Sequence, residues 1–187
     1  MKYLIIAILS FFISCLYEQQ NAMDKFQNQA SLVINLDELQ TSRVPEEVGL
    51  LTDATDLTIQ VAKPAGNWSV YPPLSWYETR VLKEPFRKLP ESIGQLKLLK
   101  SLKISGLDIH KLPASISELS NLEFLDVSFN KLVVSNELPK LNSLSNLRHL
   151  RILGNHYEEK EMQEFIRLNP TIKVVYKDER GSNKSYE

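Results

Sequence analysis

The chain has 187 residues, of which 43% are hydrophobic and 24% are charged, and this is the composition of one globular domain with a sizeable core. Its formal net charge is −1. Binding to nucleic acid depends on concentrated basic charge, so this balance excludes nucleic acid as an expected partner.

The first 14 residues have the pattern of a secretory signal peptide. Lys2 provides a positive start, and an apolar run follows from Tyr3 to Ile13, interrupted only by Ser10. A run of this length is too short for a membrane-spanning helix, which needs about 20 apolar residues. It matches the apolar region of a signal peptide instead.

Cys15, the single cysteine of the chain, follows this run directly. The segment Phe12-Ile13-Ser14-Cys15 resembles the lipobox of bacterial lipoproteins, with Phe12 where that family usually has Leu. The resemblance implies cleavage before Cys15 and attachment of lipid to its thiol. A plain signal peptide with an incidental cysteine is the alternative. Because a lone cysteine cannot close an internal disulfide, we favour lipidation.

Both ends of the remaining chain are polar. Residues 15–30 have few apolar anchors and predict a flexible tether between a membrane and the folded domain. Residues 177–187 predict a flexible tail. The folded domain is therefore expected over residues 31–176.

A repeat of about 23 residues runs through this domain. The segment from Leu99 to Leu119 follows the pattern LxxLxLxxNxL and then xxLPxxIxxL, with Leu107 at the Asn position. The same frame returns at Leu122, where Asn130 occupies that position. Projection of the period in both directions gives seven frames, which start at Ser31, Ala54, Trp76, Leu99, Leu122, Leu147 and Asn169.

This pattern resembles the leucine-rich-repeat family, in its 23-residue LPxxIxxL type. The resemblance implies an α/β solenoid, a leucine-rich-repeat arc with a parallel concave β-sheet and short helices or turns on its convex side. Apolar residues two apart, such as Leu102 and Ile104, would point to one side of a short strand and stack into a continuous core. Asn130 and Asn155 would bond the backbone where the chain leaves the strand.

The ends of the solenoid need covers. We expect an amphipathic helix over Glu158–Leu168, ended by Pro170, and a closing strand over Ile172–Tyr176. At the front, Phe26 and its neighbours are expected to cover the first strand. A two-residue insertion between Val133 and Leu141 is expected to alter a convex loop.

The stretch from Lys63 to Tyr77 departs from the frame and combines prolines with aromatic residues. Two interpretations stay open. It is either a proline-stiffened loop that covers the core edge or an aromatic ligand platform, because Trp and Tyr offer large, rigid contact areas. The residues of this possible aromatic platform are Trp68, Tyr71, Trp76 and Tyr77.

No pattern of catalytic or metal-binding chemistry occurs in the sequence. It contains no GxSxG, P-loop or HExxH motif, and its single cysteine lies outside the expected domain. His149 is expected to be a contact residue beside Arg151. We therefore predict a protein that is not an enzyme and that has no cofactor and no metal.

Function is then expected on the exposed strand residues, which become more basic toward the C-terminal repeats. The expected protein-binding residues are Asp56, Glu78, Arg80, Lys103, Phe124, Asp126, His149, Arg151 and Lys173. They predict a protein–protein interaction module of a Gram-negative cell envelope, exported and lipid-anchored to the outer membrane or facing the periplasm or cell surface. The alternatives are carbohydrate or envelope-polymer binding through the Trp68–Tyr77 loop and a purely structural scaffold.

Overall fold

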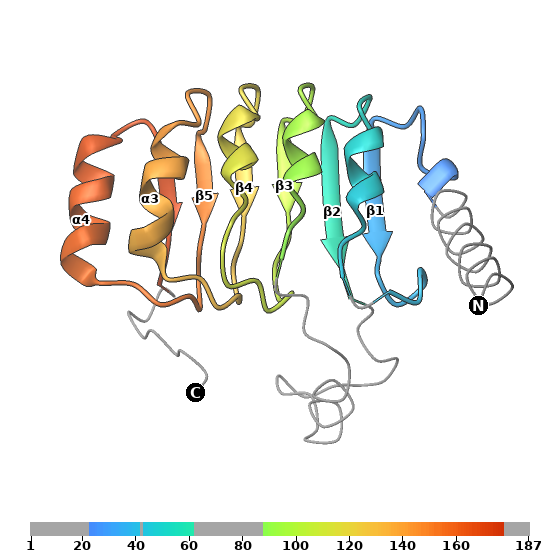
Figure 1. Ribbon diagram of the computed structural model, residues 1–187. Helices are drawn as coiled ribbons and strands as arrows, with labels where there is room; N and C mark the ends of the chain where they lie inside the picture. Colours follow the sequence, from blue (N-terminus) through green and yellow to red (C-terminus); the bar gives the residue numbers. More distant parts are fainter. Residues whose placement is uncertain (1–22, 42, 62–87, 178–187) are drawn as a thin grey trace, which may run out of the picture.

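The computed structural model describes residues 23–41, 43–61 and 88–177, and six parallel strands form one sheet within them. The strands follow one another across the sheet in chain order, which gives the molecule the form of a solenoid (Figure 1). They are β1 (Ser31–Asn35), β2 (Asp56–Gln60), β3 (Ser101–Lys103), β4 (Phe124–Asp126), β5 (His149–Arg151) and β6 (Lys173–Val175). The predicted parallel sheet is confirmed.

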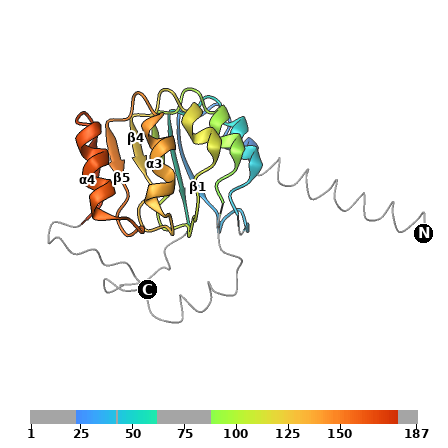
Figure 2. The same cartoon turned by 60° about the vertical axis from the view of Figure 1, so that its left-hand side comes forward.

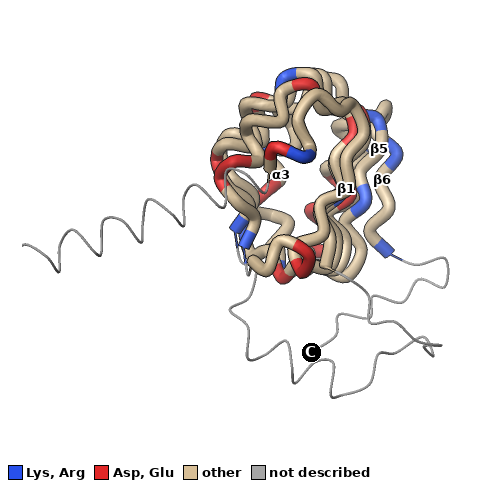
Figure 3. The backbone as a smooth tube through the Cα atoms, turned by 90° about the vertical axis from the view of Figure 1, so that its right-hand side faces the viewer, with Lys and Arg blue, Asp and Glu red and all other residues tan. Residues whose placement is uncertain are grey.

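Helices lie on one side of this sheet and leave its other side open (Figures 2 and 3). They are the 3-10 helices η1 (Glu46–Leu50), η2 (Glu91–Gln95) and η3 (Ala114–Glu118) and the α-helices α3 (Val134–Asn142) and α4 (Glu159–Leu168). Each 3-10 helix follows a proline, because the ring of Pro45, Pro90 or Pro113 holds the φ angle at −65°, −69° or −63° at the entry. The predicted α/β solenoid arc is confirmed, and we call the open side of the sheet the concave face.

The core lies between the sheet and the helices. Leu102 pairs in register with Leu125, and Leu125 pairs with Leu150, so one inward leucine of each strand stacks on the next. All three are fully buried. This continuous stack is the arrangement that the repeat predicts for inward-facing residues.

A buried asparagine completes the turn after β4. The Oδ1 atom of Asn130 accepts hydrogen bonds from the backbone N–H groups of Leu107 and Ile109, each at 3.1 Å. Its Nδ2 atom donates to the carbonyl of Ile104 at 2.8 Å. Asn155 bonds the backbone with both ends of its amide in the same way, one unit further along. The predicted role of these two amides is confirmed.

The number of units differs from the prediction. β2 pairs directly with β3, with Asp56 opposite Ser101, although 45 residues separate these two positions. Neighbouring strands elsewhere are offset by 23 to 25 residues. The described sheet therefore has no strand between β2 and β3, whereas the repeat predicts seven successive units. An insertion of almost one repeat length shifts the following repeats by the same number of residues as an additional unit would, so the sequence period alone does not distinguish the two.

The predicted tether also differs. Met23 is 1% exposed, and Phe26 packs against the core beside it. The carbonyl of Ala30 accepts hydrogen bonds from the N–H groups of Thr55 and Asp56 at 2.7 and 2.9 Å. Met23 and Phe26 thus cover the first strand, and Ala30 is bonded to the second, so the tether prediction is wrong for residues 23–30. The expected cover by Phe26 and its neighbours is confirmed.

The C-terminal cover agrees with the prediction. α4 buries Met162 and Phe165 against the core, and β6 closes the sheet. Lys177, the first residue of the predicted flexible tail, pairs with Glu159 at 3.2 Å, and the other residues of that tail lie outside the described residues. Within residues 23–177, leaving aside 42 and 62–87, no helix combines the length and the apolar content that crossing a membrane requires.

The two-residue insertion after β4 changes more than a loop. It lets the segment form the α-helix α3 where the two preceding units have 3-10 helices, and the prediction of an altered loop is corrected accordingly. Val134, Glu137 and Leu141 face the interior of the molecule. The buried carboxylate of Glu137 accepts a hydrogen bond from the N–H of Leu112 and pairs with Lys140 at 2.6 Å.

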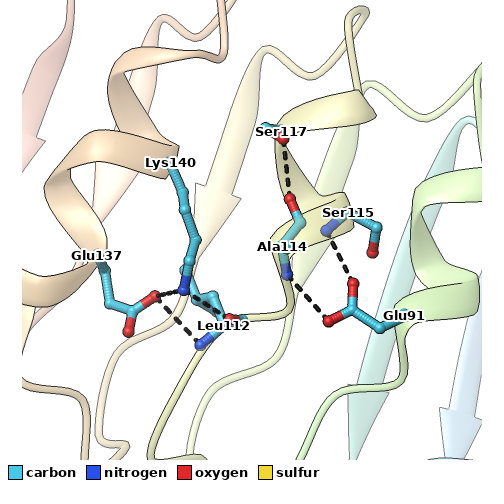
Figure 4. Close-up of polar contacts among 7 residues, drawn as sticks. All are labelled: Glu91, Leu112, Ala114, Ser115, Ser117, Glu137 and Lys140. Atoms are coloured by element: carbon cyan, nitrogen blue, oxygen red, sulfur yellow. Dashed lines mark hydrogen bonds and ion pairs between the residues drawn. The ribbon is translucent and has the colours of Figure 1, made fainter.

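A second carboxylate links neighbouring units on the convex side (Figure 4). The oxygens of Glu91 in η2 accept hydrogen bonds from the N–H groups of Ala114 and Ser115 at 3.1 and 2.9 Å. These groups open η3 and have no partner within that helix. The backbone N–H of Ser115 lowers the pKa of the Glu91 carboxyl below its usual value, because the bond favours the charged form.

Replacing Asn130 with Leu should lower the free energy of unfolding by roughly 3 kcal/mol, because the buried N–H groups of Leu107 and Ile109 lose their acceptor. Urea unfolding of the purified variants measures this. Asn121→Leu is the control, since Asn121 is exposed and makes one surface bond, to Lys97. Equal losses in the two variants would contradict the structural role of the buried amide.

Replacing Glu91 with Gln should lower stability at neutral pH by at most about 1 kcal/mol, as for an exposed helix-capping group that solvent screens. A lowered folded-state pKa gives stability that is present above the unfolded-state value, near 4.3, and is lost as the pH falls through the folded-state value. The difference from wild type should therefore shrink below about pH 4. Urea unfolding from pH 7 to pH 3 tests this, with the exposed Glu123→Gln as control. A difference that grows at low pH would contradict it.

Candidate functional site

Two rows of side chains cross β4, β5 and β6 on the concave face. Phe124, His149 and Lys173 form the first row, because they are paired in register on neighbouring strands. Asp126, Arg151 and Val175 form the second row in the same way. Neighbouring strands lie about 4.8 Å apart, so side chains in each row are within reach of one another.

These rows enclose a pocket of about 300 Å³, which we call the β4–β6 pocket. Its lining consists of Phe124, His149, Arg151, Lys173 and Val175. Four of these five residues belong to the set predicted from the sequence. Val175 does not, although it follows Lys173 by two residues and therefore lies on the same face of β6.

Phe124 is the aromatic centre of the pocket. It is half-buried, and its ring lies 6.3 Å from the ring of His149, measured between centroids. On its other side, the Nζ atom of Lys103 lies 5.6 Å from the Phe124 ring centroid, within the range of a cation–π contact. Neighbours on β3 and β5 thus hold the ring in place.

Asp126 lies beneath the pocket and not on its surface. It is 9% exposed, and its Oδ1 atom accepts a hydrogen bond from the N–H of Ser128 at 3.0 Å. Its Oδ2 atom lies 3.6 Å from Nε of Arg151. The expectation that Asp126 is an exposed contact residue is therefore corrected, because its carboxylate is buried and orients Arg151.

Positive charge dominates this end of the concave face. Lys and Arg gather on the sheet side at β5 and β6 (Figure 3). The Arg151 side chain is 46% exposed, and its ion pair with Asp126 is long. Asp56, by contrast, lies on β2, where Thr55 bonds its carboxylate at 2.8 Å, and β3 separates it from the strands of the pocket.

The remaining predicted site residues lie outside the described residues. They are Cys15, the aromatic residues Trp68, Tyr71, Trp76 and Tyr77, and the charged residues Glu78 and Arg80. In the part of the chain that the structure describes, no three His, Cys, Asp or Glu side chains are grouped so that they could hold a metal ion.

Comparison with known proteins finds a sequence family described as "Leucine-rich repeat region", which matches residues 79–180, more than half of the chain. Disease resistance-like protein DSC1 of Arabidopsis thaliana is 44% identical over 63 residues, 34% of this chain and 5% of that protein. Disease resistance protein UNI, from the same plant, is 37% identical over 70 residues, 37% of this chain and 8% of that protein. The matched region thus spans less than a tenth of the length of either relative.

Comparison with solved structures finds two similar chains at low sequence identity. A leucine-rich-repeat protein of Leptospira interrogans is 23% identical, with a TM-score of 0.45, over 71% of this chain and 34% of that chain. The leucine-rich-repeat ectodomain of the Arabidopsis thaliana receptor kinase SOBIR1 is 18% identical, with a TM-score of 0.43, over 79% of this chain and 64% of that chain.

Leucine-rich-repeat domains generally act as protein-interaction modules and are typically non-enzymatic. The matched region includes β3 to β6 and therefore the whole lining of the β4–β6 pocket. With the repeat in the sequence, the parallel sheet in the structure and this family match all in agreement, the chain belongs to the leucine-rich-repeat family.

Proposed function

We propose that this protein is a non-enzymatic interaction module that binds a partner protein through the β4–β6 pocket of its concave face. The observation that carries the proposal is an aromatic side chain, Phe124, in an open pocket beside two exposed cations, Arg151 and Lys173. Aromatic and Arg residues near the centre of an interface usually carry most of the binding energy.

Contacts within the unbound protein already restrict the side chains of the pocket. His149 and Lys103 flank the Phe124 ring, and the Asp126 carboxylate lies 3.6 Å from the Nε atom of Arg151. Ordering a side chain on binding costs about 0.5–1.5 kcal/mol, so side chains that are held in advance favour association. This supports binding at the pocket over binding elsewhere on the concave face.

The proposal places the protein at a bacterial cell envelope. It rests on the sequence of the first 15 residues, where an apolar run leads to Cys15. A single acyl chain binds a membrane only marginally, whereas the lipoprotein modification supplies several chains and anchors a protein firmly. The protein would then present its concave face to partners in the periplasm or at the cell surface.

A second candidate function is binding of carbohydrate or another envelope polymer through the Trp68–Tyr77 loop. The observation that favours it is the 45-residue offset between β2 and β3, which marks the segment with these four aromatic residues as an insertion into a regular solenoid. Insertions of this kind often carry function. A structural scaffold without a ligand is the third candidate.

The double variant Phe124→Ala, Arg151→Ala should reduce capture of the native partner from an envelope extract at least tenfold, because it removes the aromatic and cationic contacts together. Quantitative pull-down measures this, and thermal unfolding shows that the variant still folds. Val33→Ala is the control, since Val33 is exposed on β1 of the same sheet.

A Trp68→Ala, Tyr71→Ala variant separates the two binding candidates. Under the pocket proposal it should retain partner capture. If it alone loses capture, or if it alone loses retention on a cell-wall polysaccharide resin, the loop is the binding site and the pocket proposal is wrong. A scaffold would show no specific capture with any variant.

Lipidation of Cys15 predicts that growth with a clickable fatty-acid analogue labels the wild-type protein and not Cys15→Ser. In-gel fluorescence after immunoprecipitation gives the readout. The variant should also leave the membrane fraction and become recoverable in soluble form. Equal labelling of both proteins, or labelling of neither, would show that Cys15 does not carry the lipid.

A further inference from the structure

The strongest unassigned feature of the molecule is the imbalance of charge around the β4–β6 pocket. Two cationic side chains, Arg151 and Lys173, line it, and among the described residues only one carboxylate pairs with either of them, the buried Asp126 beside Arg151. Lys173 makes no hydrogen bond or ion pair through its side chain with any other described residue. An unpaired cation beside an apolar surface favours an anionic ligand that also has an apolar part.

Arg151 has spare bonding capacity in a favourable geometry. Its Nε atom faces Asp126, whereas its two terminal nitrogens have no partner among the described residues. A guanidinium presents its donors in a planar fork that matches a carboxylate. Because Asp126 faces only the Nε side, the edge of this fork that carries the two terminal nitrogens is available to an incoming carboxylate.

The other walls of the pocket are apolar. Phe124 comes from β4 and Val175 from β6, the two strands that flank β5, and His149 and Arg151 of β5 lie between them. A volume of about 300 Å³ is at the lower end of the range for small-molecule sites, and it suits one or two side chains of a longer ligand. The concave face continues past the pocket over β3, β2 and β1, so an extended segment has a surface to lie on.

We infer that the β4–β6 pocket binds an acidic peptide segment of the partner protein, with carboxylates on Arg151 and Lys173 and an adjacent aromatic or aliphatic side chain against Phe124 and Val175. This inference rests on the proposed function and adds the chemistry of the partner. It also assigns Asp126 as a positioning residue that orients Arg151 while weakening the attraction of the pocket for anions.

Synthetic peptides test this directly with the full chain. The probe is a fluorescein-labelled octapeptide in which Glu and Asp surround one Phe. Its first control has Gln and Asn at every acidic position, and its second has Ala in place of Phe. Fluorescence anisotropy at 50 mM NaCl should show the acidic Phe peptide binding at least tenfold more tightly than the amide peptide. Binding should weaken at 300 mM NaCl, because salt screens exposed charges.

Protein variants locate the site. Lys173→Gln and Arg151→Gln should each weaken binding about threefold or more, the range for exposed ion pairs. Lys160→Gln on α4 makes the same change of charge at an exposed convex position and should leave binding unchanged. Asp126→Asn should tighten binding, because the neutral side chain keeps its place between the Ser128 N–H and Arg151, and so still orients Arg151, while the negative charge that competes with an anionic ligand is gone. A residue with a merely structural role would not produce this gain.

Several results would overturn the inference. They are equal binding of the amide peptide, equal binding of the Ala peptide, an equal loss in Lys160→Gln, and weaker binding in Asp126→Asn. Vesicles of phosphatidylglycerol and phosphatidylcholine form a separate arm. Binding to these vesicles that depends on Lys173, without peptide binding, would assign the pocket to a membrane surface and overturn the peptide.

The failure of this inference is distinguishable from the failure of the proposed function. If the acidic peptide does not bind while Phe124→Ala, Arg151→Ala still loses the native partner, only the chemistry of the partner is overturned. If that variant keeps the native partner, the pocket is not the interface and both are overturned.

Discussion

The fold depends on burial of one pair of apolar side chains per strand against the pairs above and below it. Four of the six strands are three residues long, which is too short to bury a hydrophobic face alone. Leu125 is shielded from water because Leu102 and Leu150 occupy the paired positions on the two neighbouring strands. Stability of this kind is shared between neighbours, so the ends of the stack need covers. Met23 with Phe26 and helix α4 meet that need at the two ends.

Polar side chains, both the buried Asn130 and the exposed Glu91, also connect neighbouring units of the solenoid. Asn130 bonds backbone atoms of its own unit and of the preceding one. Glu91 reaches from η2 to the first N–H groups of η3. Such side chains fix the offset between units, because a shifted unit would leave buried donors without acceptors. A regular offset in turn brings Phe124, His149 and Lys173 into one row, and the geometry of the pocket follows from it.

Most of the architecture could be predicted from the sequence, because each repeat carries its own signal of strand, turn and helix. Asn130 and the buried leucines were predictable from their position in the frame alone. The direct pairing of β2 with β3 was not, because an insertion close to one period in length keeps the following frames in phase. The burial of Asp126 could not be predicted from the sequence either, because the repeat frame places this residue on the open face of the sheet. In the structure its carboxylate is buried next to Arg151.

The direct pairing of β2 with β3 has a consequence for how such a chain can change length. Three residue pairs align the two strands in parallel, and this alignment does not require a fixed number of residues between Gln60 and Lys88. The entropic free-energy cost of closing a loop rises only with the logarithm of the loop length, by about 0.6 kcal/mol for each doubling. This junction is therefore a point where segments of different length and chemistry can be exchanged at small thermodynamic cost. The concave face and the length of chain between β2 and β3 can thus diverge independently of each other.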